Sequence, residues 1–299
     1  MNLVLGTCAG YSPGKIRHFV ESLRCWFNGK AVLVTANLPP ETKGILKKYD
    51  IQEHEIHVEP PLFNIQVSRY RAYRDVLKSL KNIERAFLVD VRDVFFQADP
   101  FLMLPEAPLV AYLEEQTIGN CKINSAWITH LYGARRLADL GARSISCSGT
   151  TAGTRAGLLR YLDLMCREID AARSSPIRLA GLGARAISLA GATGGKWPGL
   201  PRYINLMGRE IYPRISGRLP LGADQGIHNH LVHGELSETI LIPNRIGAVQ
   251  TMHYQKTFLF DRLGRLLNDD GSVCPILHQI DRHPQFFSLW GIRQGMFNS

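Results

Sequence analysis

Several features of common protein classes are missing from this sequence of 299 residues. Its six cysteines fall at irregular spacings without a Cys-x-x-Cys pair, which argues against a zinc knuckle and against a dense disulfide framework. No apolar run reaches the length of about 18 residues that a transmembrane helix needs. The chain also opens without a basic leader. These absences predict a cytoplasmic protein, and they leave open a peripheral contact with the inner face of a membrane.

The composition favours one folded domain that binds an anionic ligand. Apolar residues make up 45% of the chain, enough for a large core in a single α/β domain. Lys and Arg number 35 against 26 Asp and Glu, which gives a net charge of +9. A nucleotide, an anionic lipid surface or a nucleic acid would each suit this charge. The charge alone does not choose among them.

The spacing of apolar residues predicts alternating strands and helices in the first third. Short apolar runs predict strands at 2–6, 31–35, 56–58 and 86–91. Apolar residues recur at helical spacing over 16–27 and again over 67–80. Strands that alternate with helices in this way form a parallel sheet.

The second half is less regular and predicts a mixed α/β structure. We expect strands at 109–113 and ending at Cys147, and helices over 123–140 and 158–169. Residues 171–209 contain no acidic side chain but six basic ones, which predicts a positively charged loop at about 171–220 or, equally, a solvated surface insertion. Within it, 181–186 imitates a dinucleotide-binding fingerprint, but no acidic residue follows at a distance of about 20 residues, so we discount it.

Ligands of open parallel sheets bind beyond the carboxyl ends of the strands, which directs attention to two turns. The first turn, 6–12, is rich in small residues, so a nucleotide could lie against its backbone with Tyr11 offering an aromatic face. An ordinary glycine-containing turn is the alternative.

The second turn holds Asp90, Arg92 and Asp93 within an otherwise apolar stretch. Buried charges are costly unless they are paired. Two carboxylates at a strand end can hold a divalent cation, which would neutralise a diphosphate leaving group. A salt cluster in which Arg92 pairs with either aspartate is the alternative.

The order Asp90-Val91-Arg92-Asp93, followed by Phe-Gln-Ala-Asp-Pro-Phe, resembles the metal-binding strand of glycosyltransferases with the GT-A fold. The resemblance implies a Rossmann-like α/β domain with a mixed, mostly parallel sheet flanked by helices. Its nucleotide-binding half would span 1–115 and its acceptor-binding half 116–299. The spacing between the two aspartates is one residue longer than the common form, so it stays open which of them binds the metal directly.

Three later segments resemble the same family in the expected order. Ser148 and Gly149 resemble a loop that closes on the donor sugar and the acceptor; a strand-to-helix turn is the alternative. Asp224 and Gln225 resemble a catalytic helix start, where Asp224 would be the general base of an inverting enzyme or a sugar contact of a retaining one; an N-cap is the alternative. His278 resembles the histidine that completes the metal shell, and a buried core histidine is the alternative.

Two arginines complete the predicted site. Arg69 lies where related enzymes contact the base or the phosphates of the donor. Arg282 would clamp the departing diphosphate or pair with Asp281. The predicted metal ligands are therefore Asp90, Asp93 and His278, and the predicted catalytic residues are Asp224 and Gln225. The predicted donor-binding residues are Gly6, Thr7, Tyr11, Arg69, Asp90, Arg92, Ser148, Gly149 and Arg282.

Taken with the resemblance, the sequence predicts a glycosyltransferase dependent on Mn²⁺ or Mg²⁺. It would move a sugar from a UDP- or GDP-sugar to a glycan or lipid-linked saccharide acceptor, and it would have no nucleic-acid partner. A metal-dependent phosphoryl or nucleotidyl transferase or a phosphatase is the first alternative, although the sequence has no Walker-type phosphate loop. A non-catalytic protein that binds nucleic acid or an anionic surface is the second.

Overall fold

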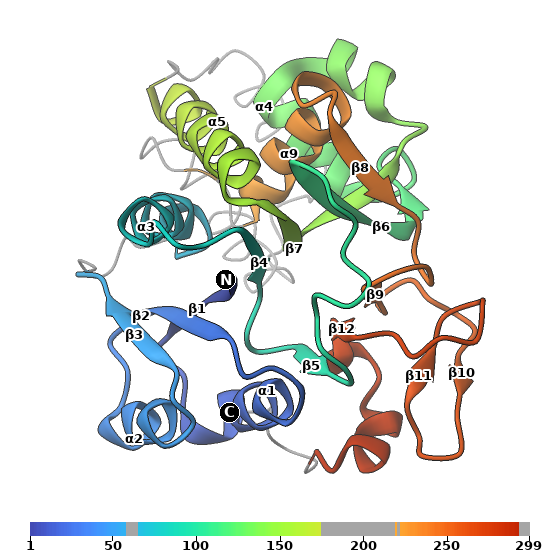
Figure 1. The fold of residues 1–299 in the computed structure, drawn as a ribbon. Helices are drawn as coiled ribbons and strands as arrows, with labels where there is room; N and C mark the ends of the chain where they lie inside the picture. Colours follow the sequence, from blue (N-terminus) through green and yellow to red (C-terminus); the bar gives the residue numbers. More distant parts are fainter. Residues whose placement is uncertain (58–64, 175–218, 220–221, 293–299) are drawn as a thin grey trace, which may run out of the picture.

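A computed structural model describes residues 1–57, 65–174, 219 and 222–292 of the chain (Figure 1). A central sheet holds seven strands in the order β3-β2-β1-β4-β7-β6-β8. These are β1 (Asn2–Ala9), β2 (Lys30–Ala36), β3 (Gln52–Glu55), β4 (Arg85–Val89), β6 (Leu109–Thr117), β7 (Ser144–Thr154) and β8 (Thr239–Ile242). Only β7 runs antiparallel to its neighbours, while the other pairs are parallel. The predicted α/β class with a mixed, mostly parallel sheet is therefore confirmed.

Helices cover both faces of this sheet (Figure 1). The helices α3 (Ile65–Ser79), α5 (Arg155–Ser174) and α9 (Ala223–His230) bury apolar side chains in one core cluster. On the other face α1 (Pro13–Trp26) packs into a second cluster, beside α2 (Pro40–Lys48). The predicted periodic residues of α1 and α3, such as Phe19 and Tyr70, are buried because they line one side of each helix.

The remaining helix, α4 (Lys122–Leu140), agrees closely with the predicted helix over 123–140. It is kinked at Gly133, whose φ of 86° lies outside the helical range. A π-helical turn, η3 (Leu231–Glu235), continues α9.

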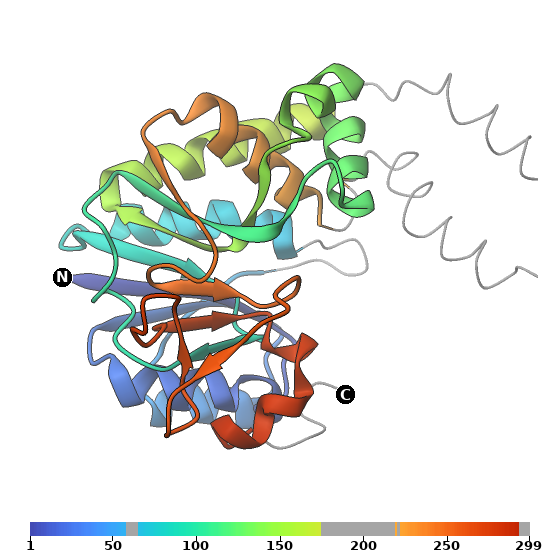
Figure 2. The same cartoon turned by 90° about the vertical axis from the view of Figure 1, so that its right-hand side faces the viewer.

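A small second sheet lies beside the large one (Figure 2). Its order is β5-β12-β9, with β5 (Val94–Phe96), β12 (Ile276–His278) and β9 (Val249–Thr251). The hairpin of β10 (Leu259–Phe260) and β11 (Leu266–Leu267) and the 3-10 helices η4 (Ile280–Arg282) and η5 (Pro284–Trp290) complete this region. Because β5 follows β4 almost directly, pairing of β5 with β12 brings the C-terminal part of the chain to the end of β4.

Several strand predictions need correction. The strand predicted at 86–91 ends at Val89, and the strand predicted to end at Cys147 continues to Thr154. The strand predicted at 56–58 is wrong at 56 and 57: β3 ends at Glu55, and Ile56 packs against the core beyond it. Residue 58 lies outside the described residues. This edge strand has polar side chains, and its pairing with β2 uses backbone groups, so apolar content did not reveal it. The first strand also runs three residues further than predicted, to Ala9.

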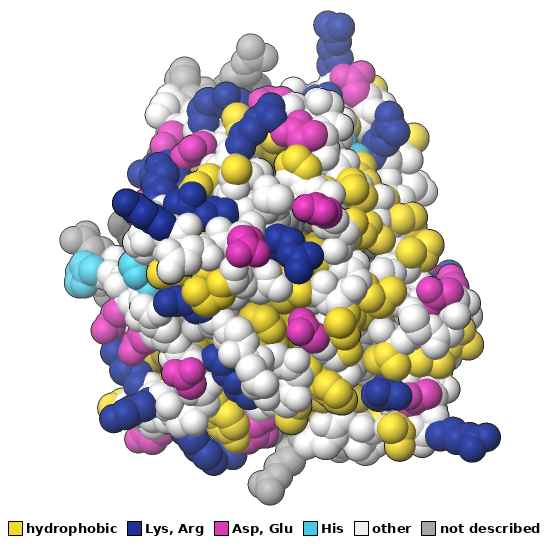
Figure 3. Space-filling model, in the orientation of Figure 1, with side chains coloured by type: hydrophobic (Ala, Val, Ile, Leu, Met, Phe, Trp, Pro, Cys, Tyr) yellow, Lys and Arg dark blue, Asp and Glu magenta, His cyan; other side chains and the backbone are white. Residues whose placement is uncertain are grey.

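Of the predicted basic segment, only residues 171–174 are described, and they belong to α5; 175–218 lie outside the described residues. In Figure 3, Lys and Arg side chains gather over α3 and α5, whereas hydrophobic side chains gather towards β9, β10 and β11. Two of the arginines on α3 are paired across to α5, Arg71 with Asp170 and Arg74 with Asp163. In the described part of the chain, no helix has the length and hydrophobicity needed to cross a lipid bilayer.

Candidate metal centre

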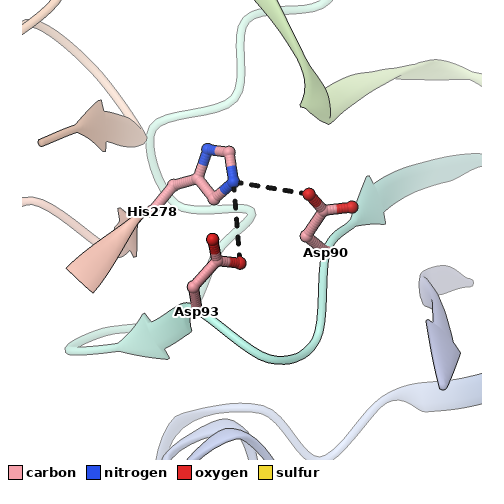
Figure 4. Close-up of side chains that lie close together, drawn as sticks. All are labelled: Asp90, Asp93 and His278. Carbon is pink, nitrogen blue, oxygen red and sulfur yellow. Dashed lines mark ion pairs between the residues drawn. The ribbon is translucent and has the colours of Figure 1, made fainter. Parts of the chain in front are cut away.

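Asp90, Asp93 and His278 meet at the carboxyl end of β4 (Figure 4). Asp90 directly follows β4, and Asp93 directly precedes β5. His278 is the last residue of β12, where it pairs with Val94, the neighbour of Asp93. The pairing of β5 with β12 thus explains how a histidine far along the chain reaches both aspartates.

The distances within this cluster suit a shared cation better than direct hydrogen bonds. Nε2 of His278 lies 3.6 Å from Oδ2 of Asp90 and 3.9 Å from Oδ1 of Asp93. One ligand atom from each residue lies within 4.8 Å of the others. Metal–ligand bonds of about 2.1 Å in an octahedral shell would separate neighbouring ligand atoms by about 3.0 Å and opposite ones by about 4.2 Å.

His278 itself indicates a missing partner. Its side chain is 1% exposed, and neither ring nitrogen has a hydrogen-bond partner among the described residues. Buried polar atoms are normally satisfied, and an unsatisfied one calls for an explanation such as an ion. Two carboxylates and an imidazole are ligands that Mn²⁺ accepts readily and that Mg²⁺ accepts in part.

Electrostatics also favour a cation at this place. Burial opposes ionisation of Asp90, but Arg69 and His278 outweigh it and hold the pKa of this carboxyl well below its usual range. Burial, the largest cause, and the nearby Asp90 together raise the pKa of Asp93 to about 6 against the opposing effect of His278. Against the effect of burial, Cys147 and Asp90 raise the pKa of His278 well above its usual value. The Asp90 side chain is 34% exposed and pairs with Arg69, whereas Asp93 forms no ion pair with a Lys or Arg of the described residues, and a divalent cation would offset its charge.

Arg69 is buried between two carboxylates. Its side chain, from α3, donates to Oδ1 of Asp90 at 2.5 Å and to Oδ2 of Asp224 at 2.9 Å. The residue is only 7% exposed. Both ion pairs therefore occupy the guanidinium that was predicted to contact the donor, and they leave Oδ2 of Asp90 facing His278.

Asp224, like Arg69, is buried and hydrogen-bonded to other side chains. It is 3% exposed, and its Oδ2 also accepts a hydrogen bond from the hydroxyl of Tyr70 at 3.0 Å. The N-cap of α9 is Gly222, with φ of 80°, so the alternative prediction that Asp224 caps this helix is wrong. The residue stands instead at the second helical position, from which its carboxylate reaches α3.

The predicted Ser148-Gly149 loop is a bulge inside β7. Ala111 and Leu113 on β6 pair with Thr151 and Ser146 on β7. The two residues of β6 are two positions apart, whereas their partners on β7 are five positions apart. The extra residues of β7 leave the ladder as a bulge beside the metal centre, a common place for bulges. No helix starts here, so the turn with a cap that was the alternative prediction is wrong.

Gly149 forms one wall of the cluster. Its carbonyl accepts a hydrogen bond from the backbone N–H of Asp90 at 2.8 Å. A Cβ atom at this position would lie 2.5 Å from Oδ2 of Asp90 and 2.8 Å from Nε2 of His278. Only glycine leaves the space between these two side chains open.

Two side-chain amides of α9 hold this bulge. Gln225 donates to the carbonyl of Ser146 at 2.6 Å and accepts from the N–H of Ser148 at 2.8 Å. Asn229, one helical turn later, accepts from the N–H of Ser146 at 2.8 Å and donates to its carbonyl at 2.9 Å. The structure thus ties Gln225 to the backbone of β7. Asn229 was missed in the sequence, where its position four residues after Gln225 was the only signal.

Arg92 and Arg282 share one carboxylate. They donate to Oδ2 of Asp281 at 2.8 Å and 2.9 Å, and the Asp281 side chain is 6% exposed. The alternative prediction that Arg282 pairs with Asp281 therefore describes the structure. The alternative that Arg92 pairs with Asp90 or Asp93 is wrong, because Arg92 reaches η4 instead.

The three residues predicted near the first turn have different surroundings. Gly6 lies inside β1, where a Cβ would lie 2.7 Å from a methyl carbon of Val91. Thr7 donates to the hydroxyl of Tyr73 at 2.6 Å. Tyr11, beyond the end of β1, lies near the metal centre: burial and then Asp90 raise the pKa of its hydroxyl to about 12. Tyr11 thus remains beside the carboxylates, whereas Gly6 and Thr7 belong to the packed strand.

Comparison with protein-family models and with curated proteins finds no match for this chain.

Proposed function

We propose that this chain is a glycosyltransferase of the GT-A type that uses Mn²⁺ or Mg²⁺ and a nucleotide diphosphate-sugar donor. The observation that carries the proposal is the grouping of Asp90, Asp93 and His278 at the carboxyl end of a central strand of an α/β sheet. This edge is where open α/β sheets bind ligands.

The protein's own residues would give such a donor a cation site and nearby positive charge. A cation held by these three side chains would neutralise the diphosphate as it leaves. Arg69 keeps Asp90 ionised and turned so that one oxygen faces His278. Arg282, whose side chain is 47% exposed, directs positive charge towards solvent at the same edge. Charge that develops on the leaving group is stabilised by such fixed groups more than the ground state is.

The alternative of a phosphatase or a phosphoryl transferase receives less support. An aspartate nucleophile needs a free carboxylate oxygen directed at phosphorus. Asp224 is engaged by Arg69 and Tyr70, and Oδ1 of Asp90 by Arg69, while Oδ2 of Asp90 and Oδ1 of Asp93 both face His278. A cation-binding role fits these constrained carboxylates better. The acceptor would be a glycan or a lipid-linked saccharide.

A thermal-shift panel tests the proposal. The chain is heated with UDP, GDP, ADP and CDP, each with and without Mn²⁺, and one of them should raise the melting temperature only when Mn²⁺ is present. A ligand at 100 times its dissociation constant stabilises the native state by about 2.7 kcal/mol. The matching nucleotide-sugar should then yield nucleoside diphosphate and a transferred or hydrolysed sugar by mass spectrometry. Sugar 1-phosphate or inorganic phosphate as the product would reject the proposal in favour of phosphoryl chemistry.

A further inference from the structure

Glu114 is a buried carboxylate that the proposed metal centre does not use. It lies near the carboxyl end of β6 and is 7% exposed. The ion pairs around the centre engage Asp90, Asp224 and Asp281. Among the described residues, no Lys or Arg forms an ion pair with Glu114. A buried carboxylate without a cationic partner is costly and calls for a reason.

The neighbours of Glu114 show which way it points. The register of β6 and β7 shifts on both sides of Leu113. The thiol of Cys147 and the imidazole of His278 both lie close enough to Glu114 to lower its pKa. Tyr112 packs in the same core cluster as Ile276, which lies two residues before His278 on β12. Glu114 therefore faces the small sheet that carries His278, at the edge of the large sheet where Asp90 lies.

The side chains around Glu114 are polar for a buried site. The thiol of Cys147 is its neighbour, and Nε2 of Gln279 lies 3.8 Å from that sulfur. Oε1 of Gln279 is buried without a hydrogen-bond partner among the described residues. Burial raises the pKa of Glu114 to about 7, while His278 lowers it, which agrees with a position close to the metal centre.

A second group of polar side chains, Cys121, Asn124 and Tyr254, lies near Glu114. The hydroxyl of Tyr254 lies 3.2 Å from the sulfur of Cys121, which in turn accepts from Asn124 at 3.2 Å. Asn124 is 8% exposed, and its Oδ1 has no partner in the described part of the chain. Cys121 and Tyr254 pack in one apolar cluster with Ile145 of β7, and Glu114 contributes to raising the pKa of the Tyr254 hydroxyl.

We infer that Glu114 and Gln279 bind the acceptor of the transfer reaction. Their oxygens would accept hydrogen bonds from hydroxyl groups of a neutral saccharide beside the cation. This inference rests on the proposed function. Hydroxyl donors satisfy a buried carboxylate that no Lys or Arg of the described residues pairs with, whereas a phosphorylated or acidic sugar would be repelled from it. A site built to bond a hydroxyl group also discriminates strongly against an acceptor that lacks it.

Steady-state kinetics of Glu114→Gln test the inference. Neutral methyl glycosides are screened with the wild-type protein and Mn²⁺, and the best acceptor is used as the probe. Loss of a charged hydrogen-bond acceptor should raise the KM of that glycoside about 10- to 100-fold. Hydrolysis of the donor by water and the midpoint of Mn²⁺ binding should change less than about twofold, because neither involves Glu114.

Glu115→Gln is the matched control, since the neighbouring Glu115 is exposed and points to the other face of β6. It should leave every value unchanged. An unchanged glycoside KM in Glu114→Gln overturns the inference, and so does an equal loss of transfer and donor hydrolysis, which would mean that Glu114 supports His278 instead. Glu114→Asp, which keeps the charge, covers the case in which Glu114→Gln does not fold: it should also raise the glycoside KM. Absence of any Mn²⁺-dependent donor turnover in the wild type would reject the proposed function itself.

Discussion

Two glutamines of this chain form similar clamps in different regions. Gln97, which follows β5, accepts from the N–H of Leu266 at 2.8 Å and donates to the carbonyl of Cys274 at 2.9 Å. Gln225, on α9, makes the equivalent pair of bonds to Ser146 and Ser148. The first clamp joins β5 to the C-terminal hairpin, and the second holds the bulge beside the metal centre.

The difference lies in what each clamped backbone touches. The backbone held by Gln225 continues to Gly149, which contacts Asp90 and His278. The hydrogen bonds of Gln97 reach Leu266, Cys274 and Pro275, and along that backbone the first candidate ligand is His278, three residues beyond Pro275. The same chemistry should therefore stabilise the fold in both regions but control cation binding in one, and this separation can be tested.

Asp93→Asn should have the largest effect. It removes one charged ligand from the cluster, while the amide keeps the shape of the side chain. Changes to residues behind metal ligands cost about 10- to 100-fold in affinity, so loss of a ligand should cost at least about 100-fold. Titration calorimetry with Mn²⁺ measures this loss, and melting curves should show an intact fold. An unchanged Mn²⁺ affinity would show that Asp93 is not a metal ligand.

Gly149→Ala should weaken Mn²⁺ binding by about 10- to 100-fold, because the added methyl group would enter the space between Asp90 and His278. Gly44→Ala is the control. No atom lies within 4 Å of a Cβ at Gly44, which is inside α2. This control should raise stability by about 0.5–1 kcal/mol without changing the affinity. Normal Mn²⁺ binding by Gly149→Ala would show that the bulge of β7 does not border the cation site.

Gln225→Ala and Gln97→Ala compare the two clamps directly. Each leaves backbone groups without partners and should cost about 2–3 kcal/mol in urea unfolding. Only Gln225→Ala should also weaken Mn²⁺ binding, by about tenfold, because the bulge loses its support. Equal effects of both variants on Mn²⁺ affinity would mean that global stability, and not the clamp, controls the site.

His228, beside these amides on α9, predicts a pH dependence of stability. Its ring is fully buried between the hydroxyls of Ser146 and Tyr161, each at 2.8 Å. Burial lowers its pKa to about 3. The ordinary value is about 6.5, so protons bind mainly to the unfolded chain between these values. The contribution is complete above about pH 6.5 and falls as the pH drops towards 3.

At pH 5 the loss should be about 2 kcal/mol. Unfolding in urea at pH 7 and pH 5 measures it. His228→Gln should reduce the dependence by this amount. The remainder comes from other groups with shifted pKa values, such as His18, whose pKa burial lowers to about 4. An unchanged slope in His228→Gln would show that His228 is not the group responsible.

Part of the candidate site was predicted from the sequence, while the substrate contacts of its residues stay predictions. Resemblance grouped Asp90, Asp93 and His278, and the structure brings these side chains together. Arg69 and Gln225 were predicted to contact substrate, yet both are engaged by other parts of the protein. Motif similarity assigns a residue to a site, but it does not show which of its atoms are already bonded.

The linear pattern by itself determined the α/β class and the helices and strands that bury an apolar side, because one buried face imposes its period on the sequence. Pairing between distant segments decided the rest. The polar edge strand β3, the bulge of β7 and the meeting of β5 with β12 depend on backbone bonds to remote strands. Asn229 and Glu114 acquire their surroundings only through these registers. Backbone pairing carries little side-chain information, so only the folded chain could reveal them.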